Sequence, residues 1–197
     1  MISRLFAISA AAFLVSSASA STILNFAGTF TADDQEQIFQ FTVSNPLSTV
    51  SVFTTSFAAG GFIPVLSLFS SQTGAFETLD SGFADNSDAI IQDWPTVPNA
   101  LYTVVLTEYD NLPAGLNISD GFTEQGNGNF TSNYGPPGPF REPFGSQLTG
   151  DWAVTFTSLD PTLTVVPEPG AGLLAGAGVL LLLFLLRRRR TAVQPTT

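Results

Sequence analysis

Carboxylates are the residues of this chain whose type could do chemistry. The sequence holds 16 Asp and Glu residues, no histidine and no cysteine. Ser-His-Asp and Cys-His catalysis, and imidazole or thiolate metal sites, therefore lack the residues that build them. Glycoside hydrolysis needs only two carboxyl groups about 5 to 10 Å apart. The candidates for such a pair are Glu77, Glu108, Glu124 and Asp151, and nothing in their spacing selects two of them.

A group of aspartates offers a second chemistry. Asp80, Asp85, Asp88 and Asp93 lie in a loop-like stretch that also contains serine and asparagine. Calcium takes about six to eight hard oxygen ligands of this kind. The spacing is not that of a recognised calcium loop, so a calcium site and solvated carboxylates at sheet ends both remain open. No other cofactor is expected.

Aromatic residues in the stretch 110–150 could bind carbohydrate. Tyr134, Phe140 and Phe144 lie among prolines and beside Arg141. Rings at a loop surface can stack against sugars, and loops longer than about 15 residues are often functional. The alternative is that this stretch packs as a cover over one open end of the fold.

The distribution of charge argues against nucleic acid as a partner. The chain has a formal net charge of -10, and Arg141 is the only basic residue between Ser21 and Val166. Such a surface has no basic clusters that could release counterions from a phosphate backbone.

Short alternating runs between residues 23 and 166 predict β-strands. Apolar and polar residues alternate with period two, and clusters of Gly, Asn, Asp, Ser and Pro separate the runs. The clearest runs are Gln37–Val43, Thr49–Phe57, Val65–Phe69, Leu101–Thr107 and Trp152–Thr157. Val65–Phe69 is apolar almost throughout, as expected of a strand covered on both faces. About seven or eight such strands predict an all-β fold, an antiparallel β-sandwich.

Phenylalanines are expected to hold the two sheets together, because each buried ring contributes about 1.5 to 3 kcal/mol. The predicted inter-sheet residues are Phe39, Phe41, Phe53, Phe69 and Phe156. In the last run Trp152, Val154 and Phe156 are expected to face inward, with Ala153, Thr155 and Thr157 outward.

Residues 1–20 have the pattern of a secretory signal peptide. A short basic start is followed by an apolar run, Leu5–Val15, and by Ala18-Ser19-Ala20. Small residues at Ala18 and Ala20 predict cleavage after Ala20. The apolar run would rise about 16 Å as a helix, roughly half the hydrocarbon thickness of a bilayer. We therefore expect export through the Sec machinery rather than an N-terminal anchor.

The C-terminal end predicts a single transmembrane helix. Gly170–Leu186 is 17 residues long and carries no charge. As a helix it would rise about 25 Å, near the lower limit for a span. Arg187, Arg188, Arg189 and Arg190 follow, and dragging all four through lipid would cost on the order of 10 kcal/mol. They are expected to stop transfer and to remain cytoplasmic with residues 191–197.

Pro167-Glu168-Pro169 stands just before this span. The two prolines favour an extended backbone, which would hold the glutamate out for an enzyme to read. The residues Val166-Pro167-Glu168-Pro169, the apolar run and the arginine cluster together resemble the PEP-CTERM sorting signal of Gram-negative bacteria, over residues 166–190. The resemblance implies a processing site at Pro167, Glu168 and Pro169, a membrane-embedded exosortase as partner, and only transient anchoring in the inner membrane. Hosts of this family typically make exopolysaccharide.

The domain itself, assigned to residues 21–165, resembles exported bacterial modules of the pre-peptidase C-terminal kind. The segments that carry the resemblance are Gly28–Val43, Gly60–Gly74, Leu101–Asn111 and Ser119–Thr131. It implies a jelly-roll-like sandwich with an accessory or binding role.

The sequence therefore predicts an exported, non-catalytic protein of the cell surface or extracellular matrix, with a structural, adhesive or polysaccharide-associated role. Two alternatives remain open. One is a small carbohydrate-active hydrolase that uses a pair of carboxylates. The other is a surface protein that stays anchored, in which the prolines around Glu168 only stiffen a spacer.

Overall fold

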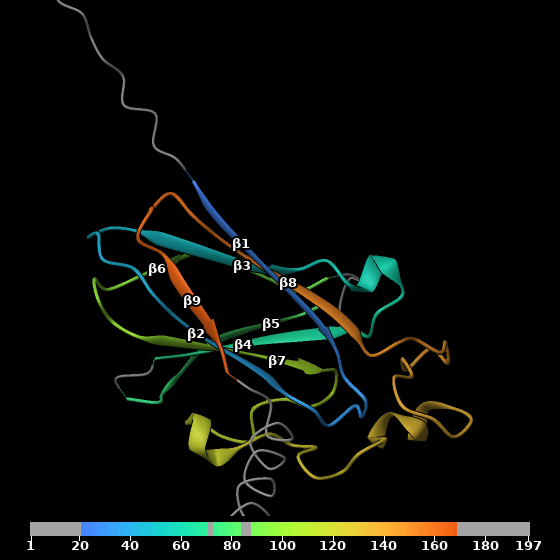
Figure 1. Ribbon diagram of the computed structural model, residues 1–197. Helices are drawn as coiled ribbons and strands as arrows, with labels where there is room; N and C mark the ends of the chain where they lie inside the picture. The colour runs from blue at the N-terminus through green and yellow to red at the C-terminus, as the bar shows by residue number, and fades with distance from the viewer. Residues whose placement is uncertain (1–20, 71–72, 84–87, 169–197) are drawn as a thin grey trace, which may run out of the picture.

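The computed structural model describes residues 21–70, 73–83 and 88–168, and these residues form nine β-strands in two antiparallel sheets (Figure 1). The strands are β1 (Thr22–Thr29), β2 (Gln37–Thr42), β3 (Thr49–Thr54), β4 (Pro64–Ser70), β5 (Phe76–Ser81), β6 (Ile90–Pro95), β7 (Tyr102–Glu108), β8 (Asp151–Ser158) and β9 (Thr164–Pro167). Three short 3-10 helices lie in the connections: η1 (Phe57–Ala59), η2 (Ile118–Asp120) and η3 (Phe130–Tyr134). The predicted all-β sandwich is confirmed for this part of the chain.

The strands pair in a nested series. One sheet has the order β1-β8-β3-β6 and the other the order β5-β4-β7-β2-β9. Within these sheets β1 pairs with β8, β2 with β7, β3 with β6 and β4 with β5. The first eight strands are thus arranged like a long hairpin rolled up on itself. β9 is added outside this series, where it pairs with β2.

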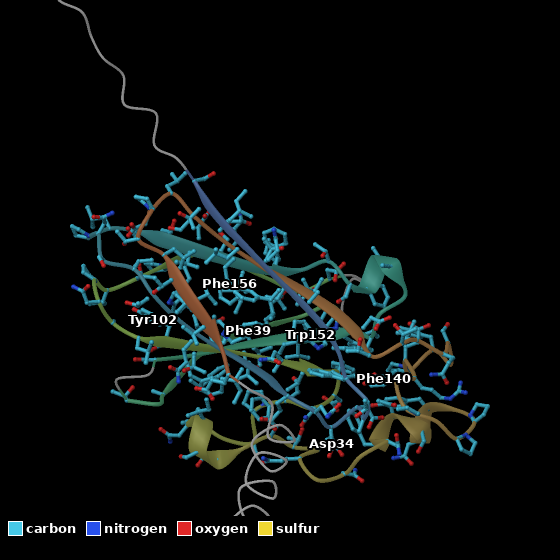
Figure 2. All side chains as sticks on the ribbon, in the orientation of Figure 1. Asp34, Phe39, Tyr102, Phe140, Trp152 and Phe156 are labelled. Atoms are coloured by element: carbon cyan, nitrogen blue, oxygen red, sulfur yellow. The ribbon has the colours of Figure 1, made fainter. Side chains whose placement is uncertain are left out.

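Alternating side chains fill the space between the sheets. On β8 Trp152, Val154 and Phe156 are buried, as predicted, while the residues between them are half-exposed. The ring centroid of Phe156 lies 5.5 Å from that of Phe39 and 5.8 Å from that of Phe41, both on β2. Figure 2 shows Phe39, Trp152 and Phe156 between the two sheets. The inter-sheet core therefore forms around aromatic side chains of β2 and β8.

Two of the predicted inter-sheet phenylalanines lie elsewhere. Phe53 is half-buried and faces away from the core, because Val50 and Val52 are the residues of β3 that alternate inward. Phe69 is buried, but in a second cluster with Val105 and Phe122. These two assignments were wrong because strand alternation defines two faces without telling which face is covered.

β4 and β7 are buried on both faces. Val104 and Leu106 contribute to the inter-sheet core, whereas Val105 belongs to the second cluster. The outer cluster is closed by the segment that follows β7, whose Phe122 ring lies 6.4 Å from that of Phe69. This segment covers part of the outer face of the five-stranded sheet, and the prediction that Val65–Phe69 is covered on both sides is confirmed.

The structure departs from the predicted boundaries at several strands. β3 ends at Thr54, and the predicted continuation to Phe57 leads into η1. β9 runs through the expected domain boundary at residue 165. The predicted signal peptide and the predicted transmembrane run lie outside the described residues. Within the described ranges no helix is long and apolar enough to cross a membrane.

Candidate functional site

The first residue of the predicted processing motif belongs to the folded domain. Pro167 is the last residue of β9 and lies opposite Phe39 of β2. The backbone N–H of Glu168 donates to the carbonyl of Ile38 at 2.9 Å. Hydrogen-bonded and non-hydrogen-bonded pairs alternate along an antiparallel ladder, so the nitrogen of Pro167 points away from β2. A proline is tolerated there because no ladder hydrogen bond is lost.

Glu168 is also held through its side chain. Gln40 Nε2 donates to Glu168 Oε1 at 2.5 Å, and Gln37 Nε2 donates to the carbonyl oxygen of Glu168 at 3.0 Å. The prediction that Glu168 is held out in solvent is wrong for this structure, because its side chain is half-buried. Residues of β2 thus form hydrogen bonds with the carboxylate and the backbone of Glu168, the groups that a processing enzyme would have to bind. Pro169 lies outside the described residues.

A cavity of about 230 Å³ adjoins Glu168 on the outer face of the five-stranded sheet. Its walls include Ile38 and Gln40 of β2, Phe69 of β4 and Ile118 of η2. Glu168 therefore borders a hollow whose walls come from β2, β7, β4 and η2.

A buried carboxylate, Asp160, fixes the turn that leads into β9. It is 3% exposed and accepts hydrogen bonds from Asn45, Ser48 and Thr162. Burial by itself would raise the pKa of Asp160, but these hydrogen bonds outweigh it and hold the pKa well below its ordinary value. Sequence reasoning missed this residue. The signal was Asp160-Pro161-Thr162, because aspartate often accepts from the backbone two residues on.

The calcium candidates accept hydrogen bonds from the protein itself. Asp80 Oδ2 accepts from the backbone of Ile90 at 2.7 Å, and Asp88 Oδ1 accepts from Thr54 Oγ1 at 2.8 Å. Asp93 Oδ1 accepts from a serine hydroxyl of β3 at 3.2 Å. Asp85 lies outside the described residues. Among those the structure describes, no three acidic side chains are placed to hold a metal ion.

Two of the catalytic candidates lie in different sheets. Glu77 is exposed on β5, at the edge of the five-stranded sheet. Asp151 is exposed at the start of β8, where it accepts a hydrogen bond from Thr29 Oγ1 at 2.7 Å. This arrangement gives no reason to pair them as acid and base.

Glu108 and Glu124 come close to one phenol. Burial first, and then neighbouring acidic groups that include Asp110, Glu124 and Glu108, raise the pKa of the Tyr134 phenol. Glu108 is 1% exposed, and its Oε2 has no hydrogen-bond partner. Burial and the nearby charge of Asp33 raise the pKa of Glu108 to about 10. Glu108 is therefore a neutral acid at pH 7, enclosed where a polymeric substrate does not reach it.

Asp33, the buried neighbour of Glu108, has hydrogen-bond donors for its carboxylate. Asp33 accepts from the backbone N–H groups of Phe130 and Thr131 at 3.1 and 3.0 Å. These bonds tie the connection between β1 and β2 to η3. Asp33 was not singled out by sequence reasoning, because an Asp33-Asp34 pair in a turn is also the ordinary pattern of an exposed loop.

The aromatic residues of the predicted sugar platform do not form one surface. Phe140 is 5% exposed and stacks on Phe62, with ring centroids 5.9 Å apart. Phe140 is therefore not part of a sugar platform. It belongs to a part of the chain that covers one end of the sandwich, as Figure 2 shows. Phe144 is 71% exposed and lies parallel to Phe83 at 6.1 Å. Tyr134 is half-buried.

The remaining predicted site residues lie outside the described part of the chain. They are the signal-cleavage residues Ala18 and Ala20 and the stop-transfer residues Arg187, Arg188, Arg189 and Arg190.

Comparisons with protein-family models, with curated proteins and with solved structures found no match for this chain.

Proposed function

We propose that this chain is an exported, non-catalytic protein of the cell surface or extracellular matrix whose C-terminal segment is processed by an exosortase. The observation that carries the proposal is the order of three features: a proline-bracketed Glu168, the uncharged run Gly170–Leu186 and four arginines. Because Glu168 is hydrogen-bonded to β2, this series begins directly at the edge of a folded domain. Sec export brings the domain outside, and the inner membrane holds it transiently.

The domain supports a structural, adhesive or polysaccharide-associated role. The nested pairing of β1 to β8 supports a jelly-roll-like sandwich, an architecture common in capsid and lectin domains. The surface carries a strong negative charge, since the segment from residue 21 to 166 has only Arg141 as a basic residue. Net charge of this kind keeps an extracellular protein soluble and keeps it from phosphate polymers.

Mass spectrometry of the tagged full chain, purified from its native cells, tests the proposal. We expect mature protein that lacks the residues after the processing motif. The Glu168→Gln variant should accumulate as full-length membrane-bound protein, because it loses the recognised carboxylate. A variant with Arg187 to Arg190 replaced by glutamine should also keep its tail, but it should be released from the membrane, because it loses the charges that stop transfer.

Two results would contradict it. Wild-type protein that ends at Thr197 would indicate a permanently anchored protein. Variants that mature identically to wild type would show that neither the motif nor the arginines direct processing. Glu124→Gln, in the covering segment, is the matched control and should mature normally.

A further inference from the structure

We propose that Val166 to Glu168 detach from β2 before the C-terminal segment is cleaved, and that Gln40 is the latch that restrains them. This inference rests on the proposed function and adds a step to it. The folded domain and the processing enzyme compete for the carboxylate of Glu168.

The position of β9 makes such detachment possible without unfolding. β9 lies outside the nested pairs formed by β1 to β8, and within the described residues its strand partner is β2. Its release leaves all four nested pairs intact. Edge segments with few buried contacts open at low free energy.

The two halves of this segment are held differently. Leu163 is 5% exposed, and Val165 packs against the inter-sheet core. Asp160 anchors the preceding turn with its hydrogen bonds. Val166, in contrast, is 62% exposed, and Glu168 is half-buried. The outer end can therefore open while the inner half stays in place.

Detachment breaks the ladder hydrogen bonds of the opposed pair Gln40 and Val166, and three hydrogen bonds made by Glu168. Gln40 Nε2 donates to the carboxylate of Glu168, and Gln37 Nε2 donates to its carbonyl oxygen. The N–H of Glu168 donates to Ile38. Gln40 occupies Oε1 of this carboxylate, so an enzyme that binds both carboxylate oxygens has to displace Gln40.

The length of chain between the folded domain and the predicted span also favours release of Val166 to Glu168. With Glu168 on the sheet, only two residue steps separate it from Gly170, the start of the predicted span, which is about 7 Å of extended chain. With Val165 as the last fixed residue, five steps give about 17 Å. The longer tether moves the bulk of the domain away from an enzyme embedded in the membrane.

A reversible disulfide tests the inference. Gln40 and Val166 are opposite each other in the register of β2 and β9, and the chain has no cysteine of its own. Directly opposed strand residues lie within the Cα separation that a disulfide spans. In the Gln40→Cys/Val166→Cys variant of the tagged full chain, oxidation should abolish loss of the tail and a thiol reductant should restore it. The control is Asn25→Cys/Thr155→Cys, an opposed pair on β1 and β8 that should mature alike in both states.

A single substitution tests the latch. Gln40→Ala should speed loss of the tail by about three- to tenfold, the factor expected when a hydrogen bond to a charged group is removed from a part-exposed site. Gln92→Ala is the matched control, because Gln92 is an exposed glutamine on β6 in the other sheet.

The outcomes separate this inference from the proposed function. If the oxidised β2–β9 pair matures as fast as its reduced form, strand release is wrong while exosortase processing stands. Slower maturation of Gln40→Ala would also overturn the inference, since the glutamine would then present the motif rather than restrain it. If the wild-type tail is never removed, both proposals fail.

Discussion

Two carboxyl groups at different places in the sandwich have almost no exposed surface, but their pKa values shift in opposite directions. Asp160, after β8, is 3% exposed and accepts hydrogen bonds from three residues. Glu108, at the end of β7, is 1% exposed, and its Oε2 has no partner. The pKa of Asp160 is lowered and that of Glu108 is raised. Burial is the main cause of the raised pKa of Glu108, whereas at Asp160 the hydrogen bonds outweigh the effect of burial.

The difference has consequences for the ends of the fold. Asp160 stabilises the turn before β9, and so helps to fix the position of the predicted processing motif. Burial disfavours a charge on Glu108, and such a charge would also face Asp33 and leave Oε2 without a hydrogen-bond donor. Asp160 therefore adds stability at neutral pH, whereas burial of Glu108 lowers it.

The largest effect is expected for Asp160→Ala. The substitution leaves the donors of Asn45, Ser48 and Thr162 without their acceptor, which should lower the free energy of unfolding by about 2 to 4 kcal/mol at pH 7. Urea denaturation of the mature protein measures it. Because the pKa of Asp160 is lowered, its stabilisation is present above the ordinary value of 3.8 and is lost as pH falls through the folded-state pKa. A loss of the same size at every pH would show that packing, and not the charge, is responsible.

A smaller effect of opposite sign is expected for Glu108→Gln. Between the ordinary pKa of 4.5 and the folded-state value of about 10, the unfolded chain releases a proton that the folded chain retains. Rising pH therefore destabilises the wild type over this range. The variant should be more stable than wild type at pH 7, relative to pH 5, by about 1 to 3 kcal/mol.

Melting curves at several pH values measure this difference. Glu77→Gln, at an exposed position on β5, is the control and should follow the wild-type pH dependence. If Glu108→Gln keeps the wild-type slope, then Glu108 is ionised in the folded protein and the contrast with Asp160 disappears.

The smallest effect is expected for Asp93→Asn, a carboxylate that is hydrogen-bonded but exposed. Asp93 has φ of 48°, which asparagine also adopts readily, and asparagine keeps an acceptor for Ser51. The change in free energy of unfolding should stay within about 0.5 kcal/mol. A loss comparable to that of Asp160→Ala would mean that hydrogen bonding stabilises these carboxylates regardless of burial.

Much of the fold could be predicted from local pattern. The alternation of Trp152, Val154 and Phe156 is strict, and β8 has the predicted faces. β1, β5, β6 and β9 were not among the clearest runs. β1 contains the small residues Ala27 and Gly28, and β9 spans only Thr164–Pro167. Phe53 was placed in the wrong environment because its strand has apolar residues on both faces.

The candidate site was less predictable. The sequence predicted that Glu168 is held out for a processing enzyme, and it did not reveal the sheet partners Gln37 and Gln40, which lie more than a hundred residues away. It likewise offered Glu108 as a catalytic candidate, because nothing near it in the chain reveals that Phe140 and η3 cover that end of the sandwich.

By itself the sequence determined the chemistry that is absent, the β-strand character of the domain and the order of motif, apolar run and arginines. These depend on residue inventory and on period-two alternation, which are local properties. The tertiary structure alone decided that Pro167 ends a strand of the sheet, that Glu168 is bound by glutamines of β2, and that Asp160 and Glu108 differ in charge. Pairing partners and burial depend on contacts between residues distant along the chain, and only the folded chain brings these together.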